Sequence, residues 1–131
     1  MKLDDVYSML ALCLSEMPKG FPKPRLVVHE SPESLVQFLG DEPYAFHHAN
    51  DFPPALVLGI ADAARNAIHM AYSTIASEEP EVLLDTLLHE IGHLYQAQKH
   101  GKGSAQYLYE RPANAFARRW VRRLKKKAVQ S

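Results

Sequence analysis

Residues 83–98 read LLDTLLHEIGHLYQAQ, a stretch in which leucine and isoleucine side chains surround the pattern HEIGH at residues 89–93. Apolar residues spaced three and four apart favour a helix with a buried face. Acidic residues in the first turn suit the helix dipole, and Gly101 suits the helix end. Gly92 costs up to about 1 kcal/mol relative to alanine in a helix interior, which indicates that another group approaches its backbone closely. The stretch therefore predicts a largely buried helix over residues 77–101.

The HEIGH pattern places three polar side chains where a metal ion can be held. Residues four apart lie one above the other on a helix, so His89 and His93 can direct two imidazoles at one ion, an arrangement that zinc accepts. Glu90 lies one step around the helix, where it can take a proton from a metal-bound water. A core helix does not bury such groups without partners, because their desolvation is costly. We therefore expect one zinc ion (Zn2+) per chain at this helix.

A site with two histidines needs a third protein ligand, and Glu110 is the best candidate downstream. His100 lies at the end of the same helix, which cannot bring it back to the metal, and Tyr95 and Tyr107 are weaker candidates. A second helix is expected over about residues 110–127. Its first turn would then carry Glu110 close to the HEIGH helix.

The second helix has an apolar face that Glu110 extends. Ala113, Asn114 and Ala117 share this face, so Asn114 can hydrogen-bond a ligand histidine from one turn beyond Glu110. The alternative is that Glu110 only complements the dipole at the start of its helix.

The composition indicates one small domain without a charge bias. The chain has 131 residues, 47% of them hydrophobic, and fifteen basic residues balance fifteen acidic ones. This length fits a single domain over residues 1–131. No apolar run approaches the roughly 20 residues that span a bilayer, and the N-terminus does not resemble a signal peptide. Because Cys13 is the single cysteine, no internal disulfide forms, and we expect a cytoplasmic protein without a membrane partner.

Positive charge gathers near the C-terminus, where a basic tail covers about residues 122–131. Arg118, Arg119, Arg122 and Arg123 fall on the solvated side of the predicted helix, and cations are favoured at a helix C-terminus. A nucleic-acid partner is therefore not expected, although the tail also suits an acidic partner. The sequence does not indicate an oligomeric state.

The remaining elements predict a small α+β domain. Its small, mostly antiparallel sheet would carry the HEIGH helix and the Glu110 helix on it. A helical reading of the alanine-rich stretch after residue 55 is the alternative to a hairpin there. The expected elements are a helix over 3–16, a strand over 25–30, a short helix from Pro32 to Gly40, a loop over 41–54, and hairpin strands over 55–61 and 67–73.

HEIGH followed by a helix with the pattern ExxANxFA resembles the ImmA/IrrE family of zinc metallopeptidases, within the gluzincin group. The resemblance covers about residues 55–124. It implies a minimal zincin fold in which the two HEIGH histidines and Glu110 bind zinc and Glu90 is the general base. The second pattern comprises Glu110, Ala113, Asn114, Phe116 and Ala117.

The resemblance also implies a protein or peptide substrate, since members of the family resemble regulators that cleave a transcriptional repressor. It implies that an edge strand before the active-site helix pairs with the substrate, a place that His69 and Ala71 would occupy. The chain departs from the family at Pro112, where members often carry an acidic residue. The alternative function is a non-proteolytic zincin-fold binding or regulatory module of phage or toxin–antitoxin type, against which the intact Glu90 argues.

Other polar side chains have weaker claims to a role. Tyr95, Tyr107 and Tyr109 are candidates for polarising a scissile carbonyl, although packing is the simpler role for each. His69 can approach the cleft, but a solvent-facing position on its strand is favoured. The loop histidines at 47 and 48 are expected to be exposed.

Overall fold

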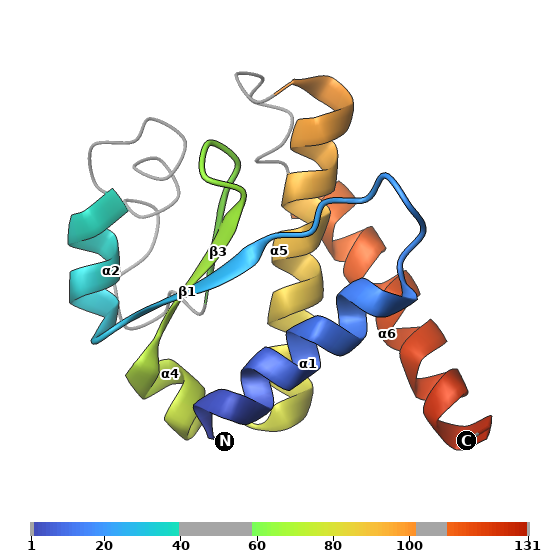
Figure 1. Cartoon of the computed structure of the whole chain (residues 1–131), viewed down its shortest axis with the longest axis horizontal. Helices are drawn as coiled ribbons and strands as arrows, with labels where there is room; N and C mark the ends of the chain where they lie inside the picture. The colour runs from blue at the N-terminus through green and yellow to red at the C-terminus, as the bar shows by residue number, and fades with distance from the viewer. Residues whose placement is uncertain (1, 40–58, 102–109, 131) are drawn as a thin grey trace.

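The computed structural model describes residues 2–39, 59–101 and 110–130, whose arrangement is shown in Figure 1. The architecture is α+β, as the sequence predicts. The elements in chain order are α1 (Leu3–Glu16), β1 (Arg25–His29), α2 (Pro32–Leu39), β2 (Ile60–Asp62), β3 (Ala67–Ala71), α4 (Tyr72–Ser77), α5 (Pro80–His100) and α6 (Glu110–Gln130). The predicted loop over 41–54 and the loop histidines lie outside the described residues.

Among the described residues, the sheet has three strands in the order β1-β3-β2. β2 and β3 are antiparallel, which confirms the predicted hairpin, but β1 pairs with β3 in parallel. The prediction of a mostly antiparallel sheet is therefore wrong. Among the described strands β3 is central, so the prediction that His69 and Ala71 lie on an edge strand is also wrong. Local patterns could not reveal this, because β1 is brought beside β3 by a long-range pairing.

The hairpin is shorter than predicted at its far end. β3 ends at Ala71, and the chain continues directly into α4 where a strand to residue 73 was expected. Thr74 and Ile75 are buried, and α4 packs against α1 and β3. Burial of Thr74 and Ile75 on one side of this short helix outweighs the β preference of the Tyr-Ser-Thr-Ile sequence.

Helix α5 forms the centre of the protein and closely matches the predicted helix over 77–101. Glu79 is its N-cap and Pro80 its first residue, a position that suits proline. Gly101 ends it with φ of 96° and donates its backbone N–H to the Ala97 carbonyl over 2.8 Å. Glycine adopts this left-handed conformation without steric cost. The ten buried residues of α5 are Leu83, Thr86, Leu87, Leu88, Glu90, Ile91, Gly92, His93, Leu94 and Ala97.

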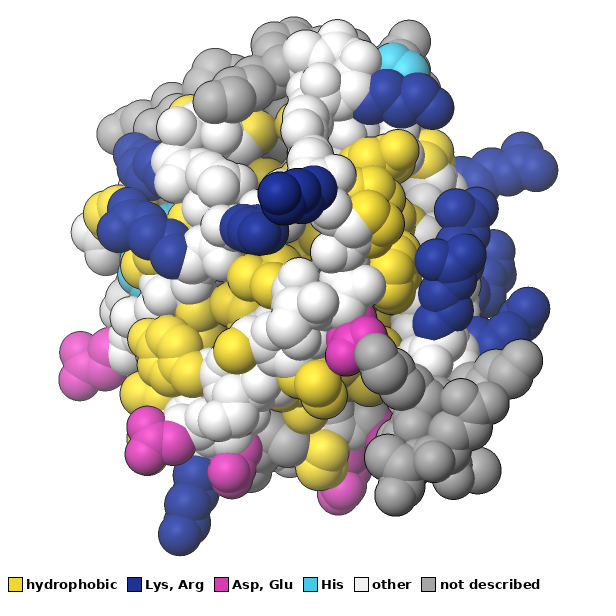
Figure 2. Space-filling model, turned by 45° about the vertical axis from the view of Figure 1, so that its right-hand side comes forward, with side chains coloured by type: hydrophobic (Ala, Val, Ile, Leu, Met, Phe, Trp, Pro, Cys, Tyr) yellow, Lys and Arg dark blue, Asp and Glu magenta, His cyan; other side chains and the backbone are white. Residues whose placement is uncertain are grey.

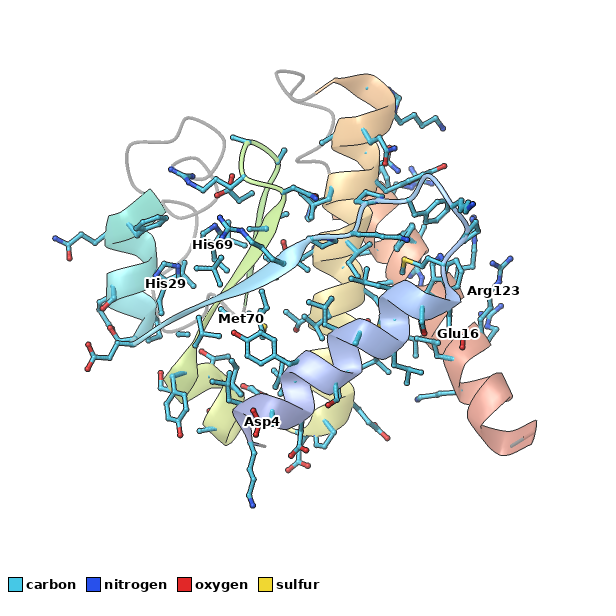
Figure 3. All side chains as sticks on the ribbon, in the orientation of Figure 1. Asp4, Glu16, His29, His69, Met70 and Arg123 are labelled. Carbon is cyan, nitrogen blue, oxygen red and sulfur yellow. The ribbon has the colours of Figure 1, made fainter. Side chains whose placement is uncertain are left out.

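The sheet separates two layers. α5 packs on one face together with α1, and α2 covers the opposite face (Figure 1). Side chains alternate between these faces along β3: Met70 points towards α1 and α5, whereas His69 points towards α2 (Figure 3). None of the helices among the described residues has the length and apolarity that crossing a membrane requires.

Helix α1 contributes apolar side chains to the core beside α5. Val6, Leu10 and Cys13 are buried, in agreement with the predicted helix over 3–16. Burial raises the pKa of the Cys13 thiol to about 11. Cys13 therefore behaves as a small apolar side chain.

Helices α5 and α6 cross at Gly92. A Cβ atom added to Gly92 would lie 3.1 Å from the Cα atom of Ala113 and 3.2 Å from its carbonyl oxygen. It would also lie 3.1 Å from Cβ of Phe116. The close approach predicted at this glycine is confirmed, and the approaching group is the backbone of α6.

Candidate metal centre

His89, Glu90 and His93 form a compact group on α5. One ligand atom from each residue can be chosen such that the three atoms all lie within 4.8 Å of one another. The Nε2 atoms of His89 and His93 are 3.1 Å apart, and the two rings are nearly perpendicular. His93 and Glu90 are buried and His89 is half-buried. The helical spacing therefore brings the HEIGH side chains together as predicted.

The donor set fits a divalent metal ion. Two nitrogens bound at about 2.0–2.1 Å in a tetrahedral zinc site lie roughly 3.3 Å apart. The Nε2 atoms of His89 and His93 come within a few tenths of an ångström of this separation at 3.1 Å. The half-buried position of His89 leaves the group open to solvent on one side. These three residues can hold a metal ion; the identity of that ion is not fixed by the geometry.

Gly59 packs beside this group of residues, a contact that was not predicted from the sequence. A Cβ atom on Gly59 would lie 3.1 Å from Cγ2 of Thr86 and 3.5 Å from Cγ of Glu90. The start of β2 therefore packs directly against the side of α5 that carries Glu90. A glycine directly before an Ile-Ala-Asp strand is the only sequence signal of this approach.

The predicted third ligand is the first residue of α6. Glu110 lies one helical turn before Ala113, whose backbone meets Gly92. Its side chain lies outside the described residues, so ligation by Glu110 stays a prediction. Ala113 and Ala117 are buried as predicted, but Asn114 is exposed beside them, so the predicted buried face does not include it. Its hydrogen bond to a ligand histidine also stays a prediction.

Of the three tyrosine candidates, Tyr95 lies within the described residues. Tyr95 is half-buried and packs against two aromatic rings, with ring centroids 4.7 Å from Phe21 and 5.6 Å from Phe116. These contacts agree with the packing role. Tyr107 and Tyr109 lie outside the described residues. His100 is exposed at the end of α5, consistent with its rejection as a ligand.

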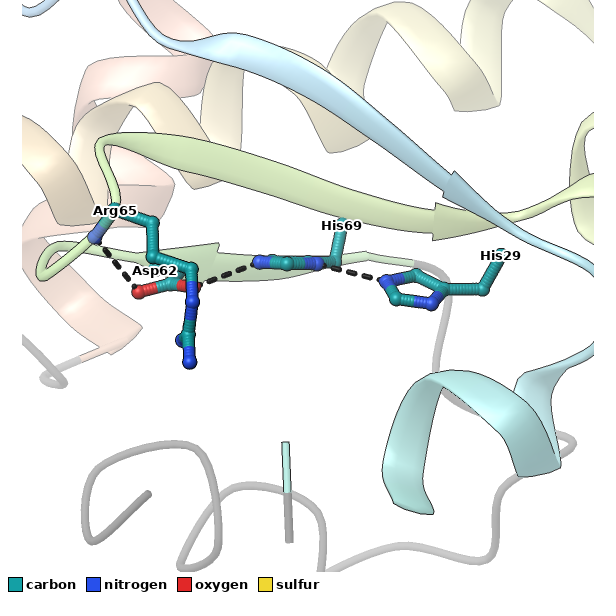
Figure 4. A network of polar contacts seen from close by, with 4 residues as sticks. All are labelled: His29, Asp62, Arg65 and His69. Carbon is teal, nitrogen blue, oxygen red and sulfur yellow. Dashed lines mark hydrogen bonds and ion pairs between the residues drawn. The ribbon is translucent and has the colours of Figure 1, made fainter. Parts of the chain in front are cut away.

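A second polar cluster lies on the face of the sheet that α2 covers (Figure 4). Nε2 of His69 is 2.8 Å from Oδ2 of Asp62, and Nδ1 of His69 is 2.8 Å from Nε2 of His29. Arg65 donates its backbone N–H and a guanidinium N–H to the same carboxylate. His69 and Asp62 are fully buried, so the preference for a solvent-facing His69 is wrong.

The sequence patterns do not indicate the rest of this cluster, because its members come from three different strands. Asp62 ends β2, His69 is in the middle of β3, and His29 ends β1. Burial, and then repulsion from His69, lower the pKa of His29 below its ordinary value. The Phe38 ring lies beside both histidines, with centroids 5.1 Å from His29 and 5.7 Å from His69.

Exposed arginines run along α6. Figure 2 shows Lys and Arg side chains gathered on one side of the molecule. Arg118, Arg119, Arg122 and Arg123 of α6 are exposed, which confirms the predicted solvated face. α6 continues to Gln130, so the backbone of the basic tail extends this helix.

A hollow of about 510 Å³ lies beside the last turns of α5. Its walls come from the segment before β1, from the β2–β3 turn and from Leu94, Ala97 and Gln98. None of its described lining residues belongs to the HEIGH group, so this hollow does not form a cleft over the candidate metal centre.

The fold and the site define an α+β protein with a helical His-Glu-His group that could hold a metal ion. Comparison of the chain with protein-family models, curated proteins and solved structures gave no match. The resemblance to the ImmA/IrrE family therefore depends on the two motifs alone.

Proposed function

We propose that this protein is a zinc-dependent metallopeptidase in which His89, His93 and Glu110 bind the metal and Glu90 is the general base. The observation that carries the proposal is the 3.1 Å separation of the two Nε2 atoms, with Glu90 in the same compact group. Helix interiors do not gather two histidines and a buried carboxylate without a use for them, because desolvation of these groups is costly.

The position of α6 supports Glu110 as the third ligand. The contact between Gly92 and Ala113 brings the first turn of α6 to the part of α5 that carries His93. Glu110 lies one turn before that contact, at the start of the helix. A third protein ligand from this position leaves one coordination place for water, as catalytic zinc sites require.

The chemistry divides between the ion and the protein. A bound zinc ion supplies positive charge that acidifies a water molecule and polarises a carbonyl group. Glu90 accepts a proton from the attacking water and donates it to the leaving amine as the peptide bond breaks. Its burial on α5 holds the carboxylate at a fixed place beside the histidines.

The substrate in this proposal is a protein or peptide, with a repressor-type regulator as the first candidate from the motif resemblance. The substrate does not pair with β3, because β1 and β2 flank that strand. The alternative, a zincin-fold module without proteolysis, is an outcome of the experiment below.

The test compares wild type with Glu90→Gln and His93→Ala, measuring zinc per chain and cleavage of a denatured protein substrate. Wild type should bind zinc and cleave. Glu90→Gln should retain zinc with at least a 100-fold loss of cleavage, as expected when a general base is removed. His93→Ala should lose the zinc at this site.

Each outcome separates the alternatives. Zinc bound at this site by wild type and by Glu90→Gln, together with no cleavage by wild type, would favour the non-proteolytic module. Wild-type zinc content that His93→Ala does not change would contradict the metal site itself. Glu110→Ala tests the third ligand, with at least a 10-fold weaker zinc affinity expected.

A further inference from the structure

The chain of polar groups across the sheet has the arrangement of a metal ligand with its supporting carboxylate. Asp62, His69 and His29 come one from each strand and lie on the same face, as the strand register requires. A buried histidine with hydrogen-bonding groups at both ring nitrogens has its orientation and its proton position fixed.

The carboxylate decides which nitrogen of His69 carries the proton. An ionised carboxylate only accepts hydrogen bonds, so His69 donates from Nε2 to Asp62. Arg65 pairs with the same carboxylate at 2.8 Å, which favours its ionised form. With a single ring proton on Nε2, Nδ1 of His69 offers its lone pair to Nε2 of His29, which lies 2.8 Å away.

We propose that His29 and His69 are the protein ligands of a second metal ion, on the face of the sheet opposite α5. Histidines that bind metals almost always donate their other ring N–H to a carboxylate or carbonyl, as His69 does to Asp62. In the metal-free protein a proton on His29 bridges the two nitrogens over 2.8 Å. When the ion takes this place, the proton of His29 moves from Nε2 to Nδ1, so both facing nitrogens carry lone pairs.

The required movement is small. Nitrogens in a tetrahedral site lie roughly 3.3 Å apart at bond lengths of about 2.0–2.1 Å. The distance between Nε2 of His29 and Nδ1 of His69 must therefore increase from 2.8 Å by roughly half an ångström. The corresponding increase for His89 and His93 is about 0.2 Å. His29 is half-buried at the end of an outer strand of the described sheet, so its ring can make this adjustment. His69 is fully buried and stays in place.

The donor set selects the class of ion. Imidazole nitrogens suit zinc, copper and nickel, whereas calcium and magnesium require oxygen ligands. Neutral imidazole is the form of histidine that binds these metals. Water would complete the coordination. With two protein ligands, this ion is bound more weakly than one at a three-ligand site.

The test isolates the second site by starting from His93→Ala, in which the HEIGH group is broken. Zinc alone is titrated into this variant against a chromophoric chelator. One zinc per chain is expected. Adding His29→Gln should abolish that binding, because the Gln amide still donates a hydrogen bond to Nδ1 of His69 but is a poor zinc ligand. Asp62→Asn should weaken the affinity about 10- to 100-fold, the usual effect of changing a supporting partner.

The same titration on otherwise unchanged protein avoids dependence on how well His93→Ala folds. His29→Gln alone should bind one zinc fewer than wild type. Zinc content that His29→Gln does not alter would contradict the proposal, whichever other histidines bind the ion. Failure of the HEIGH site gives a different result: His93→Ala and wild type would bind equal amounts, and His29→Gln would still lose one.

Discussion

Two pairs of histidines in this protein place ring nitrogens about 3 Å apart, but the chain holds them together in different ways. His89 and His93 lie one turn apart on α5, so helix geometry alone aligns them. His29 and His69 are 40 residues apart and meet only because β1 pairs with β3. The first pair can be predicted from a local sequence motif, whereas the second forms only when the sheet folds.

The largest expected effect is a difference in how much each histidine pair contributes to the stability of the fold. In metal-free protein, Asp62→Ala should lower the free energy of unfolding by about 2–3 kcal/mol, because it leaves the buried Nε2–H of His69 without its acceptor and removes the carboxylate that Arg65 contacts. His89→Ala removes a half-buried hydrogen bond and should cost about 1 kcal/mol. Urea unfolding in the presence of a chelator measures both. Equal losses would show that the network across the sheet has no special structural role.

A second prediction concerns the helix crossing on which only the first pair depends. Gly92→Ala forces a Cβ atom into the backbone of Ala113 at 3.1 Å. Overpacking of this kind costs about 1–3 kcal/mol, from which better helix propensity recovers up to about 1 kcal/mol. The variant should therefore be less stable by up to about 2 kcal/mol, with weaker zinc binding at the HEIGH site.

Gly59→Ala is the matched control for this prediction. Its new Cβ atom would meet the Thr86 side chain, which can adjust more easily than backbone. A smaller loss of stability is expected in the same urea experiment. Wild-type stability and zinc affinity in Gly92→Ala would mean that α5 and α6 do not need their close contact.

The smallest predicted effect is on the pH dependence of stability. The pKa of His29 is lowered in the folded protein, so between that value and about 6.5 the unfolded chain binds more protons than the folded one. The contribution of His29 is complete above about pH 6.5 and is lost as the pH falls towards its folded pKa. Unfolding curves of metal-free protein from pH 5 to pH 8 should therefore be steeper in pH for wild type than for His29→Gln. Identical slopes would contradict this account.

The sequence predicted most of what depends on local pattern. The 3.6-residue periodicity around HEIGH, together with Gly101, located α5 to within a few residues. Pro32 at the start of α2 and the buried stripe of α1 were read from similar signals. Each of these features is determined by neighbours within one or two turns, and so is the closeness of His89 to His93.

What the sequence did not reveal depends on pairing across long distances. The parallel insertion of β1 put β3 in the centre of the sheet, and with it buried His69. Asp62 directly follows the predicted strand over 55–61, and no neighbouring residue indicates that its carboxylate accepts a hydrogen bond from His69. α4 differs from the predicted strand end because burial of Ile75 outweighs local preference.

The central claim is that the HEIGH group of α5 binds a metal ion. It is tested most directly by a crystal structure of zinc-loaded protein, with anomalous difference maps calculated from data on both sides of the zinc absorption edge. A peak within bonding distance of Nε2 of His89 and Nε2 of His93, with Glu110 as the third ligand, is predicted. Two histidines hydrogen-bonded to each other without a zinc peak between them would contradict the claim.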